Sequence, residues 1–299
     1  MSKIAFCFPG QGSLETGMGR EIAEAVPEAM DVLRRGSEAS GLDLVIVATV
    51  TPDMAFPATA AIIADELGAH AAGAYDLSAG CTGFMYAVAQ AYGMLAGGLA
   101  QRALVVGGDV LSKILDWSDR GTAVLFGDGA GAVVLERVGQ GGFLGFELGA
   151  DGSGGPQLYL PAGGSRAPAT AESVAERRHF VQMNGREVFK FATRVLVASA
   201  EAVLAECGRT IEDVDVYVPH QANVRIIEYA TQKLGIPDDR VVIDVDRYGN
   251  TSSGSIPLAL ADAKADGRLA AGRLVLMTGM GAGLTWGSGL IEWTDGGRT

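Results

Sequence analysis

The chain has 299 residues, of which 48% are hydrophobic and 19% charged, and its net charge at pH 7 is -12. This acidic balance argues against nucleic acids and anionic membranes as partners, because both are recognised by clustered basic residues. No apolar run approaches the roughly 20 residues needed to span a bilayer. The three cysteines have neither metal-ligand nor disulfide spacing. We therefore expect a cytoplasmic protein with reduced thiols, no metal site and no membrane segment.

Apolar strand-like runs alternate with alanine-rich helical stretches, which predicts an α/β architecture with helices covering sheet faces. The expected order in the first half is strand 3–8, helix 19–37, strand 43–50, helix 57–67, strand 73–77, helix 82–96, strand 102–110 and strand 123–135. The second half is expected to contain strand 142–148, helix 185–205, strand 214–219, helix 224–234, strand 241–245, helix 253–265, strand 274–278 and strand 287–293. Residues 149–178, rich in Gly, Pro and Ala, are expected to form a surface connection.

This order of elements repeats along the chain. In the first half a buried strand leads to Cys81 and then to a helix of small residues. In the second half a strand leads to Asn250, and again a helix of small residues follows. Each half ends with two apolar strands. We therefore predict two similar halves, residues 1–148 and 149–299, which pack across a pseudo-twofold axis.

Cys81 lies in the segment DLSAGCTGF, where a strand runs through a sharp glycine turn into a helix. This position predicts a sulfur at a helix N-terminus, where the helix dipole favours the thiolate. The small neighbours Ala79, Gly80 and Gly83 would let a substrate approach the sulfur and backbone N–H groups face it. The alternative is a buried structural cysteine, but the flanking geometry favours an activated nucleophile.

Two polar residues of the second half also follow predicted strands. His220, in VPHQANVRII, stands between a hydrophobic strand and a helix, and Asn250, in RYGNTSSGS, occupies the turn that corresponds to that of Cys81. Loops at strand ends line clefts in α/β folds. Asn250 alone would equally suit an ordinary turn or helix cap. Together with Cys81, the two residues supply a nucleophile and two polar groups able to hydrogen-bond an oxyanion.

A family resemblance becomes specific at this point. Between Asp43 and Trp293 the chain contains, in order, VIVATVTPDMAFPATA, AGCTGF, LVVGGDVLS, DRGTAVLFGDGAGAVVLE, MNGREVFKFA, VPHQANVRII, DRYGNTSSGSIPLAL and GAGLTWGS. In these stretches it resembles the β-ketoacyl-acyl carrier protein synthase III family. The resemblance implies an α/β, thiolase-like fold, in which two pseudo-twofold-related βαβαβαββ halves form a layered α-β-α-β-α core.

The resemblance also implies that Cys81, His220 and Asn250 are a catalytic triad for a decarboxylating Claisen condensation. Cys81 would take the acyl group of an acyl-CoA primer, and the backbone N–H groups of Cys81 and Ala282 would form the oxyanion hole. His220 and Asn250 would hydrogen-bond the thioester carbonyl of malonyl-acyl carrier protein. Its decarboxylation would yield the carbanion that attacks the acyl-cysteine and gives a 3-oxoacyl-acyl carrier protein. No cofactor is implied beyond these two substrates.

Supporting roles follow from the same resemblance. Substrate or CoA contacts are implied for Arg120, Asn223, Gly185, Phe189 and Phe56. The family forms homodimers, in which the residue matching Phe56 reaches toward the partner's acyl pocket.

A basic patch is also predicted on the helix 185–205. Arg186, Lys190 and Arg194 are spaced by four residues and share one face of it, with Arg225 nearby. Such a patch is usually a solvated helix face. Because the implied partner, acyl carrier protein, is acidic, we predict that it docks there.

The first forty residues do not match this family. The segment KIAFCFPGQGSLETGMGREIAEA resembles the opening of malonyl-CoA:acyl carrier protein transacylases, although the G-H-S-x-G nucleophile motif of those enzymes is missing. The Trp and Arg that hold the CoA adenine in the synthase III family have no counterpart before Asp43. Two alternatives to condensation therefore remain open. One is a Cys81-dependent acyl transfer in a specialised pathway, and the other is a catalytically impaired scaffold or partner subunit.

Overall fold

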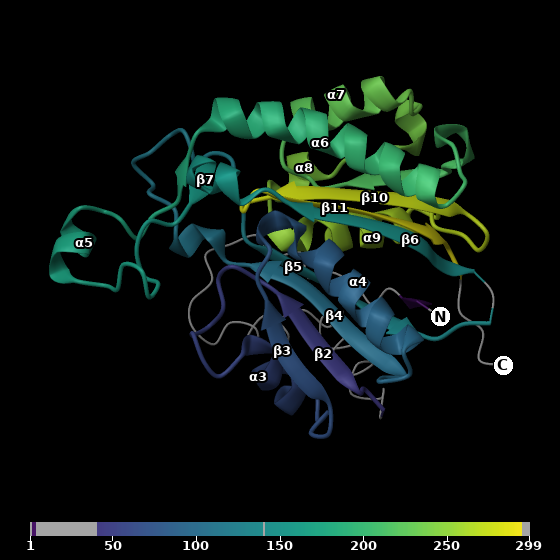
Figure 1. Cartoon of the computed structure of the whole chain (residues 1–299), viewed down its shortest axis with the longest axis horizontal. Coiled ribbons are helices and arrows are strands. Elements are labelled where there is room, and N and C mark those ends of the chain that lie inside the picture. Colours follow the sequence, from purple (N-terminus) through teal and green to yellow (C-terminus); the bar gives the residue numbers. More distant parts are fainter. Residues whose placement is uncertain (1, 4–40, 140, 295–299) are drawn as a thin grey trace.

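The structure, a computed structural model, describes residues 2–3, 41–139 and 141–294. Two β-sheets alternate with three layers of helices in this part of the chain (Figure 1). The layers follow the order α-β-α-β-α, as the sequence predicts. No helix within the described ranges is both long enough and apolar enough to cross a membrane.

The first sheet is built from the N-terminal half and has the strand order β1-β5-β4-β2-β3. Its strands are β1 (Ser2–Lys3), β2 (Leu44–Ala48), β3 (Gly73–Leu77), β4 (Arg102–Asp109) and β5 (Gly129–Glu136). β2 runs parallel to β3 and β4, whereas β4 and β5 are antiparallel. All residues of β2 are buried, as expected of a central strand with helices on both faces.

The second sheet has the strand order β6-β11-β10-β9. Its strands are β6 (Gly142–Ala150), β9 (Val216–Pro219), β10 (Leu274–Gly281) and β11 (Thr285–Glu292). β9 and β10 are parallel, and β10 and β11 are antiparallel, which repeats the relation among β2, β4 and β5. The repeated order seen in the sequence is therefore present in the strand pairing. β6 pairs with β11 although it lies mainly before residue 149, so the division at that residue stays a prediction.

Two helices of small residues lie between the sheets. They are α4 (Gly83–Ala96), which contacts β2, β4, β6 and β11, and α9 (Ser255–Ala265), which contacts β5 and β9. Eight of the eleven residues of α9 are buried, and the main hydrophobic core joins both helices to both sheets. A helix that is apolar on all sides needs such a central position. The turns that precede α4 and α9 are thereby brought together between the two halves.

The outer layers cover the remaining faces of the sheets. α3 (Thr59–Glu66) packs on β2 and β3, and α6 (Gly185–Glu206) packs on β10 and β11 beside α7 (Val224–Leu234). The connection at 149–178 contains α5 (Ala171–Ala175), which projects from the body of the molecule in Figure 1. The short strands β7 (Leu158–Tyr159) and β8 (Gln182–Met183) lie before and after α5 in the sequence and pair with each other.

Two predicted strands differ from the structure. The strand expected at 123–135 begins only at Gly129, after a turn. The strand expected at 241–245 makes only a single bridge, between Val241 and Tyr217, and then enters α8 (Val245–Tyr248). The buried carboxamide of Gln221 donates to the Val242 carbonyl and accepts from the Asp244 N–H. One side chain thus binds backbone groups that a neighbouring strand would otherwise bind.

Candidate active site

Cys81 lies in the 3-10 turn Gly80–Thr82, between the end of β3 and the start of α4. The turn requires glycine at position 80, where φ is +57° and an added Cβ would lie 2.7 Å from the backbone N and O of Ala282. Gly281 is equally close on the other side, since a Cβ there would lie 2.5 Å from the Cys81 N. The backbone of the turn Gly281–Gly283, at the end of β10, therefore packs directly against the turn of Cys81.

The environment of the thiol differs from the sequence expectation of a dipole-favoured thiolate. Cys81 is buried, and desolvation raises the pKa of its thiol to about 11, with the charge of Asp109 adding to this rise. Three polar groups close to the sulfur oppose the shift, namely the Ser252 side chain and the backbone N–H groups of Cys81 and Ala282. Burial outweighs these groups in the free protein, because an anion loses its hydration there. The resting cysteine is therefore a thiol.

The two N–H groups that approach the sulfur are those predicted to form the oxyanion hole. Cys81 and Ala282 come from different halves of the chain, at the start of α4 and the end of β10. Both N–H groups lower the pKa of the thiol. Such a pair of converging backbone donors can stabilise an oxygen anion that develops on a thioester bonded to the sulfur.

His220 directly follows β9 and is 1% exposed. Its backbone N–H donates to the Thr278 carbonyl on β10 at 2.7 Å, and its Nδ1 lies 2.5 Å from Ser255 Oγ. Nε2 is buried and has no hydrogen-bond partner among the described residues. Burial lowers the pKa of the imidazole to about 4, so the ring is neutral at physiological pH. A buried, unpartnered ring nitrogen is available to a substrate atom.

Asn250 precedes the 3-10 turn Ser252–Gly254 that leads into α9, and it is 6% exposed. Its Oδ1 accepts the backbone N–H of Ser252 at 2.9 Å. This bond fixes which end of the amide is the acceptor and leaves the Nδ2 protons for another group. Its backbone is also tied to the first half, since Gly127 N–H donates to the Asn250 carbonyl at 2.8 Å.

The start of α9 links these three residues. The turn Ser252–Gly254 packs against the turn that carries Cys81, and the backbone N–H of Ser252 donates to Asn250. Ser255, three residues further on, contacts His220. Cys81, His220 and Asn250 thus lie around one short segment, and their shared catalytic role stays a prediction. Sequence reasoning missed both serines, although their hydroxyls in NTSSGS are an unusual polar content for the start of a buried helix.

Asp109, at the end of β4, is a second feature that sequence reasoning missed. It is 3% exposed, and its Oδ1 accepts the Thr49 hydroxyl at 3.1 Å and the Val50 N–H at 2.7 Å. Its Oδ2 accepts the N–H and the hydroxyl of Ser253, at 3.2 and 2.8 Å. This carboxylate joins the first half to the segment between Asn250 and Ser255. The signal in the sequence is an acid that ends the apolar strand LVVGGD.

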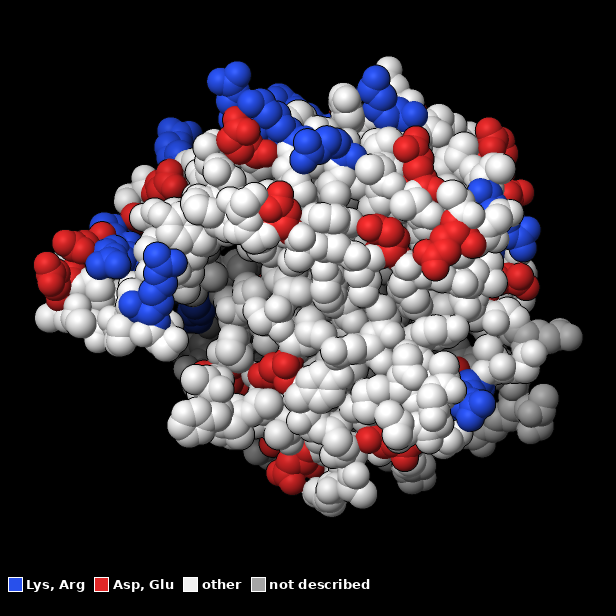
Figure 2. Space-filling view, viewed as in Figure 1, with Lys and Arg blue, Asp and Glu red and all other residues white. Residues whose placement is uncertain are grey.

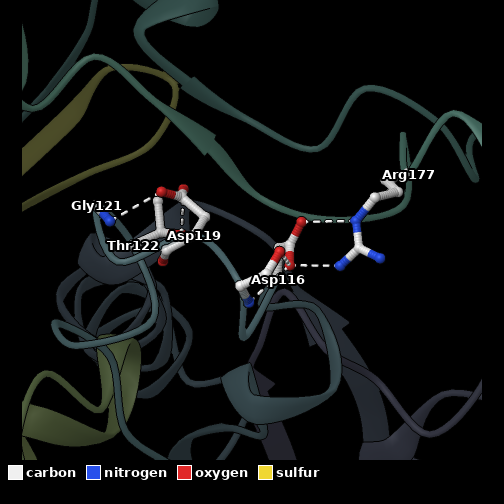
Figure 3. Close-up of polar contacts among 6 residues, drawn as sticks. Asp116, Asp119, Gly121, Thr122 and Arg177 are labelled. Carbon is white, nitrogen blue, oxygen red and sulfur yellow. Dashed lines mark hydrogen bonds and ion pairs between the residues drawn. The ribbon is translucent and has the colours of Figure 1, made fainter.

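Arg120 is exposed on a turn whose shape comes from Asp119. The Asp119 carboxylate accepts the Gly121 N–H and the Thr122 hydroxyl, each at 2.8 Å (Figure 3). Beside this turn, Arg177 binds Asp116 with two guanidinium nitrogens. The pKa of the Asp116 carboxyl is held well below its usual range by Arg177 and Ser118. The ion pair between Arg177 and Asp116 thus joins the segment after α5 to the segment that carries Arg120. The sequence did not predict this contact.

The other predicted contacts lie nearer the surface. Asn223 is the N-cap of α7, and its side chain accepts the Arg225 N–H at 2.9 Å. Gly185 is the first residue of α6, and Phe189, one turn later, is 40% exposed. Phe56 is 84% exposed in the loop before α3. None of the contacts among the described residues brings these four residues to Cys81, so their substrate roles stay predictions.

Comparisons with known proteins place the chain in a family. Two family models match, 3-oxoacyl-[acyl-carrier-protein (ACP)] synthase III over residues 75–152 and its C-terminal model over residues 204–293. The β-ketoacyl-[acyl-carrier-protein] synthase III of Desulfitobacterium hafniense Y51 is 54% identical over 257 residues, which are 86% of this chain and 78% of that protein. A relative of the same name from Symbiobacterium thermophilum is 52% identical over 270 residues, 90% of this chain and 81% of that protein.

Solved structures extend the likeness to three dimensions. The Thermus thermophilus β-ketoacyl-[acyl carrier protein] synthase III superposes with a TM-score of 0.81 at 48% identity, covering 90% of this chain and 83% of that one. The Aquifex aeolicus 3-oxoacyl-[acyl-carrier-protein] synthase III gives 0.79 at 40% identity, covering 89% and 82%. Fold and site together define a thiolase-like acyltransferase.

Within that class, the chain belongs to the β-ketoacyl-acyl carrier protein synthase III family. The family and the fold inferred from the motifs of the sequence are thereby confirmed. The transacylase-like segment predicted at residues 1–40 lies outside the described residues, apart from Ser2 and Lys3, and none of these similarities supports it.

Proposed function

We propose that this protein condenses an acyl-CoA with malonyl-acyl carrier protein to give a 3-oxoacyl-acyl carrier protein, with Cys81 as the nucleophile. The observation that carries the proposal is the segment from Asn250 to Ser255, which packs against the turn of Cys81 and contacts His220 through Ser255. The family of the chain, defined above, is that of enzymes with this activity.

Acylation is the first stage. The Cys81 sulfur attacks the carbonyl carbon of the acyl-CoA thioester, and the N–H groups of Cys81 and Ala282 bind the resulting oxyanion. The bond between the carbonyl carbon and the CoA sulfur then breaks. The proton of the Cys81 thiol leaves with the CoA sulfur, so the products are the acyl-cysteine and CoA thiol. Because burial raises the thiol pKa, the donors around the sulfur have to stabilise the anion as it forms.

Condensation is the second stage. Malonyl-acyl carrier protein loses carbon dioxide, and the electron pair of the broken C–C bond becomes an enolate, whose oxygen accepts hydrogen bonds from His220 Nε2 and Asn250 Nδ2. The carbanion carbon attacks the acyl-cysteine carbonyl. The C–S bond to Cys81 breaks, and the thiolate takes a proton from solvent. Two neutral donors suit this stage, since a carboxylate at position 250 would repel the enolate.

The basic patch predicted for carrier protein docking lies on the exposed side of α6 and α7. Figure 2 shows lysine and arginine side chains gathered over these helices, at the top of the view. The patch residues Arg186, Lys190, Arg194 and Arg225 are all exposed. Lys190 also binds Glu187 at 2.7 Å, which leaves the three arginines as the main source of positive charge. An acidic carrier protein would be attracted to this surface in a salt-dependent manner.

A homodimer is part of the proposal. β3 ends the first sheet with β2 as its one partner in the described part of the chain. Natural proteins cover or block such an exposed strand edge. Phe56, 84% exposed, and Met54, 48% exposed, precede α3, which packs on β3. Pairing of two copies along β3 would cover the edge, and Phe56 would then lie close to the partner.

A radiolabel assay with malonyl-acyl carrier protein and a panel of acyl-CoA primers tests the function. We expect one carbon dioxide to be released for each 3-oxoacyl product, and Cys81→Ala to abolish both. Product formation without carbon dioxide would instead indicate acyl transfer to oxygen or nitrogen. Absence of an acyl adduct on Cys81 after incubation with acyl-CoA would indicate a scaffold or partner subunit.

A further inference from the structure

The imidazole of His220 has one nitrogen with a partner and one without. Nδ1 lies 2.5 Å from Ser255 Oγ, whereas Nε2 is buried without a hydrogen-bond partner among the described residues. A protonated Nε2 donates to a substrate carbonyl, and a bare Nε2 accepts a proton, for example from a thiol. The tautomer of this ring therefore decides what His220 contributes to each stage of the proposed function, on which an inference about Ser255 rests.

The hydrogen-bonding capacity of Ser255 distinguishes the two tautomers. Ser255 is 1% exposed, and its Oγ already accepts the backbone N–H of Gln221 at 3.3 Å. Were the ring proton on Nδ1, Oγ would accept a second bond, and the hydroxyl proton would have no acceptor among its described contacts. A buried donor without a partner costs roughly 1–3 kcal/mol. With a bare Nδ1, the Ser255 hydroxyl donates to Nδ1 and still accepts the Gln221 N–H, so these three groups all have partners.

We propose that Ser255 is a positioning residue, which donates its hydroxyl proton to His220 Nδ1 and thereby holds the proton of the neutral imidazole on Nε2. The Nε2–H is then already oriented to donate to the thioester oxygen, where negative charge develops during decarboxylation. The same tautomer has no lone pair on Nε2 to accept the thiol proton. Acylation therefore depends on the groups that lower the thiol pKa, among them the backbone N–H groups of Cys81 and Ala282.

The chain contains a second serine–histidine pair that serves as a matched control. Ser173 Oγ lies 2.9 Å from His179 Nε2 at the projecting helix α5. Ser173 is also buried, at 4% exposure. Ser173→Ala removes a serine–histidine contact of the same kind at a position that has no contact with Cys81, His220 or Asn250 among the described residues.

Ring-nitrogen NMR on the 15N-histidine-labelled protein reads the tautomer directly, because the chain has only three histidines. The wild-type His220 is expected to show a protonated Nε2 and a bare Nδ1 at pH 7. Ser255→Ala is expected to shift the ring toward a mixture of tautomers, whereas Ser255→Thr, which keeps a hydroxyl, retains the wild-type pattern. Ser173→Ala leaves the His220 signals unchanged. A protonated Nδ1 in the wild type, or an unchanged tautomer in Ser255→Ala, would overturn the proposal.

Separate assays of the two stages supply the functional readout. Acylation is followed by intact mass after mixing with acyl-CoA, and condensation by carbon dioxide released from malonyl-acyl carrier protein. Ser255→Ala is expected to slow condensation about 10-fold or more and acylation less than about 2-fold, because only condensation uses the Nε2 donor. Equal losses in both stages for the folded variant would contradict the proposal. Failure of the wild type to release carbon dioxide would refute the proposed function instead, and the NMR result would still decide the tautomer.

Discussion

Gly281 packs so closely against Cys81 that a methyl group there must displace the turn that carries Ala282. A Cβ at position 281 would lie 2.5 Å from the Cys81 N and 3.0 Å from its Cβ. Neither atom is the end of a flexible side chain, so relief requires movement of one backbone segment relative to the other. That movement separates the N–H groups of Cys81 and Ala282. Loss of one oxyanion donor costs roughly 3 kcal/mol, or about 100-fold to 1,000-fold in rate.

We therefore expect Gly281→Ala to slow acylation of Cys81 by about 100-fold. The assay is the rise of the acyl-enzyme mass in a quenched-flow experiment with saturating acyl-CoA. Gly279→Ala, two residues earlier on β10, is the control, because the three atoms nearest to its Cβ are all in side chains, the first being the end of Ile256 at 3.4 Å. Acylation of folded Gly281→Ala at the wild-type rate would show that the two N–H groups do not form the oxyanion hole.

Three further predictions concern charge and pH. Burial raises the pKa of the Asp244 carboxyl to about 7 from its ordinary 3.8. Between these pH values the folded state keeps a proton that the unfolded state has lost. The free energy of unfolding therefore falls as pH rises from about 4 to 7, by up to about 4 kcal/mol. Asp244→Asn should therefore raise the free energy of unfolding at pH 8 but not at pH 4, as measured by urea denaturation; equal effects at both pH values would refute the assignment. Because the pKa of His220 is lowered to about 4, the rate of condensation should not fall around pH 6.5 when the pH is lowered from 8 to 5.5. A fall in rate centred on pH 6.5 would indicate an imidazole that titrates normally. Charge reversal of Arg194 and Arg225 to Glu should raise the KM for malonyl-acyl carrier protein about 10-fold or more and leave acylation by acyl-CoA within about 2-fold; a parallel change in both would place the docking surface elsewhere.

Much of the fold and of the site could be predicted from the sequence, because the relevant signals are local. Strand-to-helix turns at Cys81 and Asn250 are marked by small residues, and the apolar runs around them alternate regularly. The resemblance to a family then joined these turns into one site. In the structure the two turns lie between the sheets and contact each other, and the catalytic roles of these residues stay predictions.

The features that could not be predicted depend on contacts between distant residues. Asp109 and Ser253 are 144 positions apart, and nothing in either segment indicates that a carboxylate of one half binds the other. The strand expected at 241–245 was wrong because the Gln221 carboxamide occupies its backbone groups. The expectation of a stabilised thiolate considered the helix dipole alone, whereas burial of Cys81 has the larger effect on its pKa.

A single-turnover chase tests the central claim most directly. Wild type and Asn250→Asp are first acylated with acyl-CoA, freed of excess substrate and then mixed with malonyl-acyl carrier protein. We predict that both acquire the acyl mass on Cys81, that the wild type loses it with one equivalent of carbon dioxide, and that Asn250→Asp retains it, because an acidic side chain replaces the neutral donor. Acyl groups found on Cys207 rather than Cys81, or equally rapid discharge from Asn250→Asp, would contradict the account.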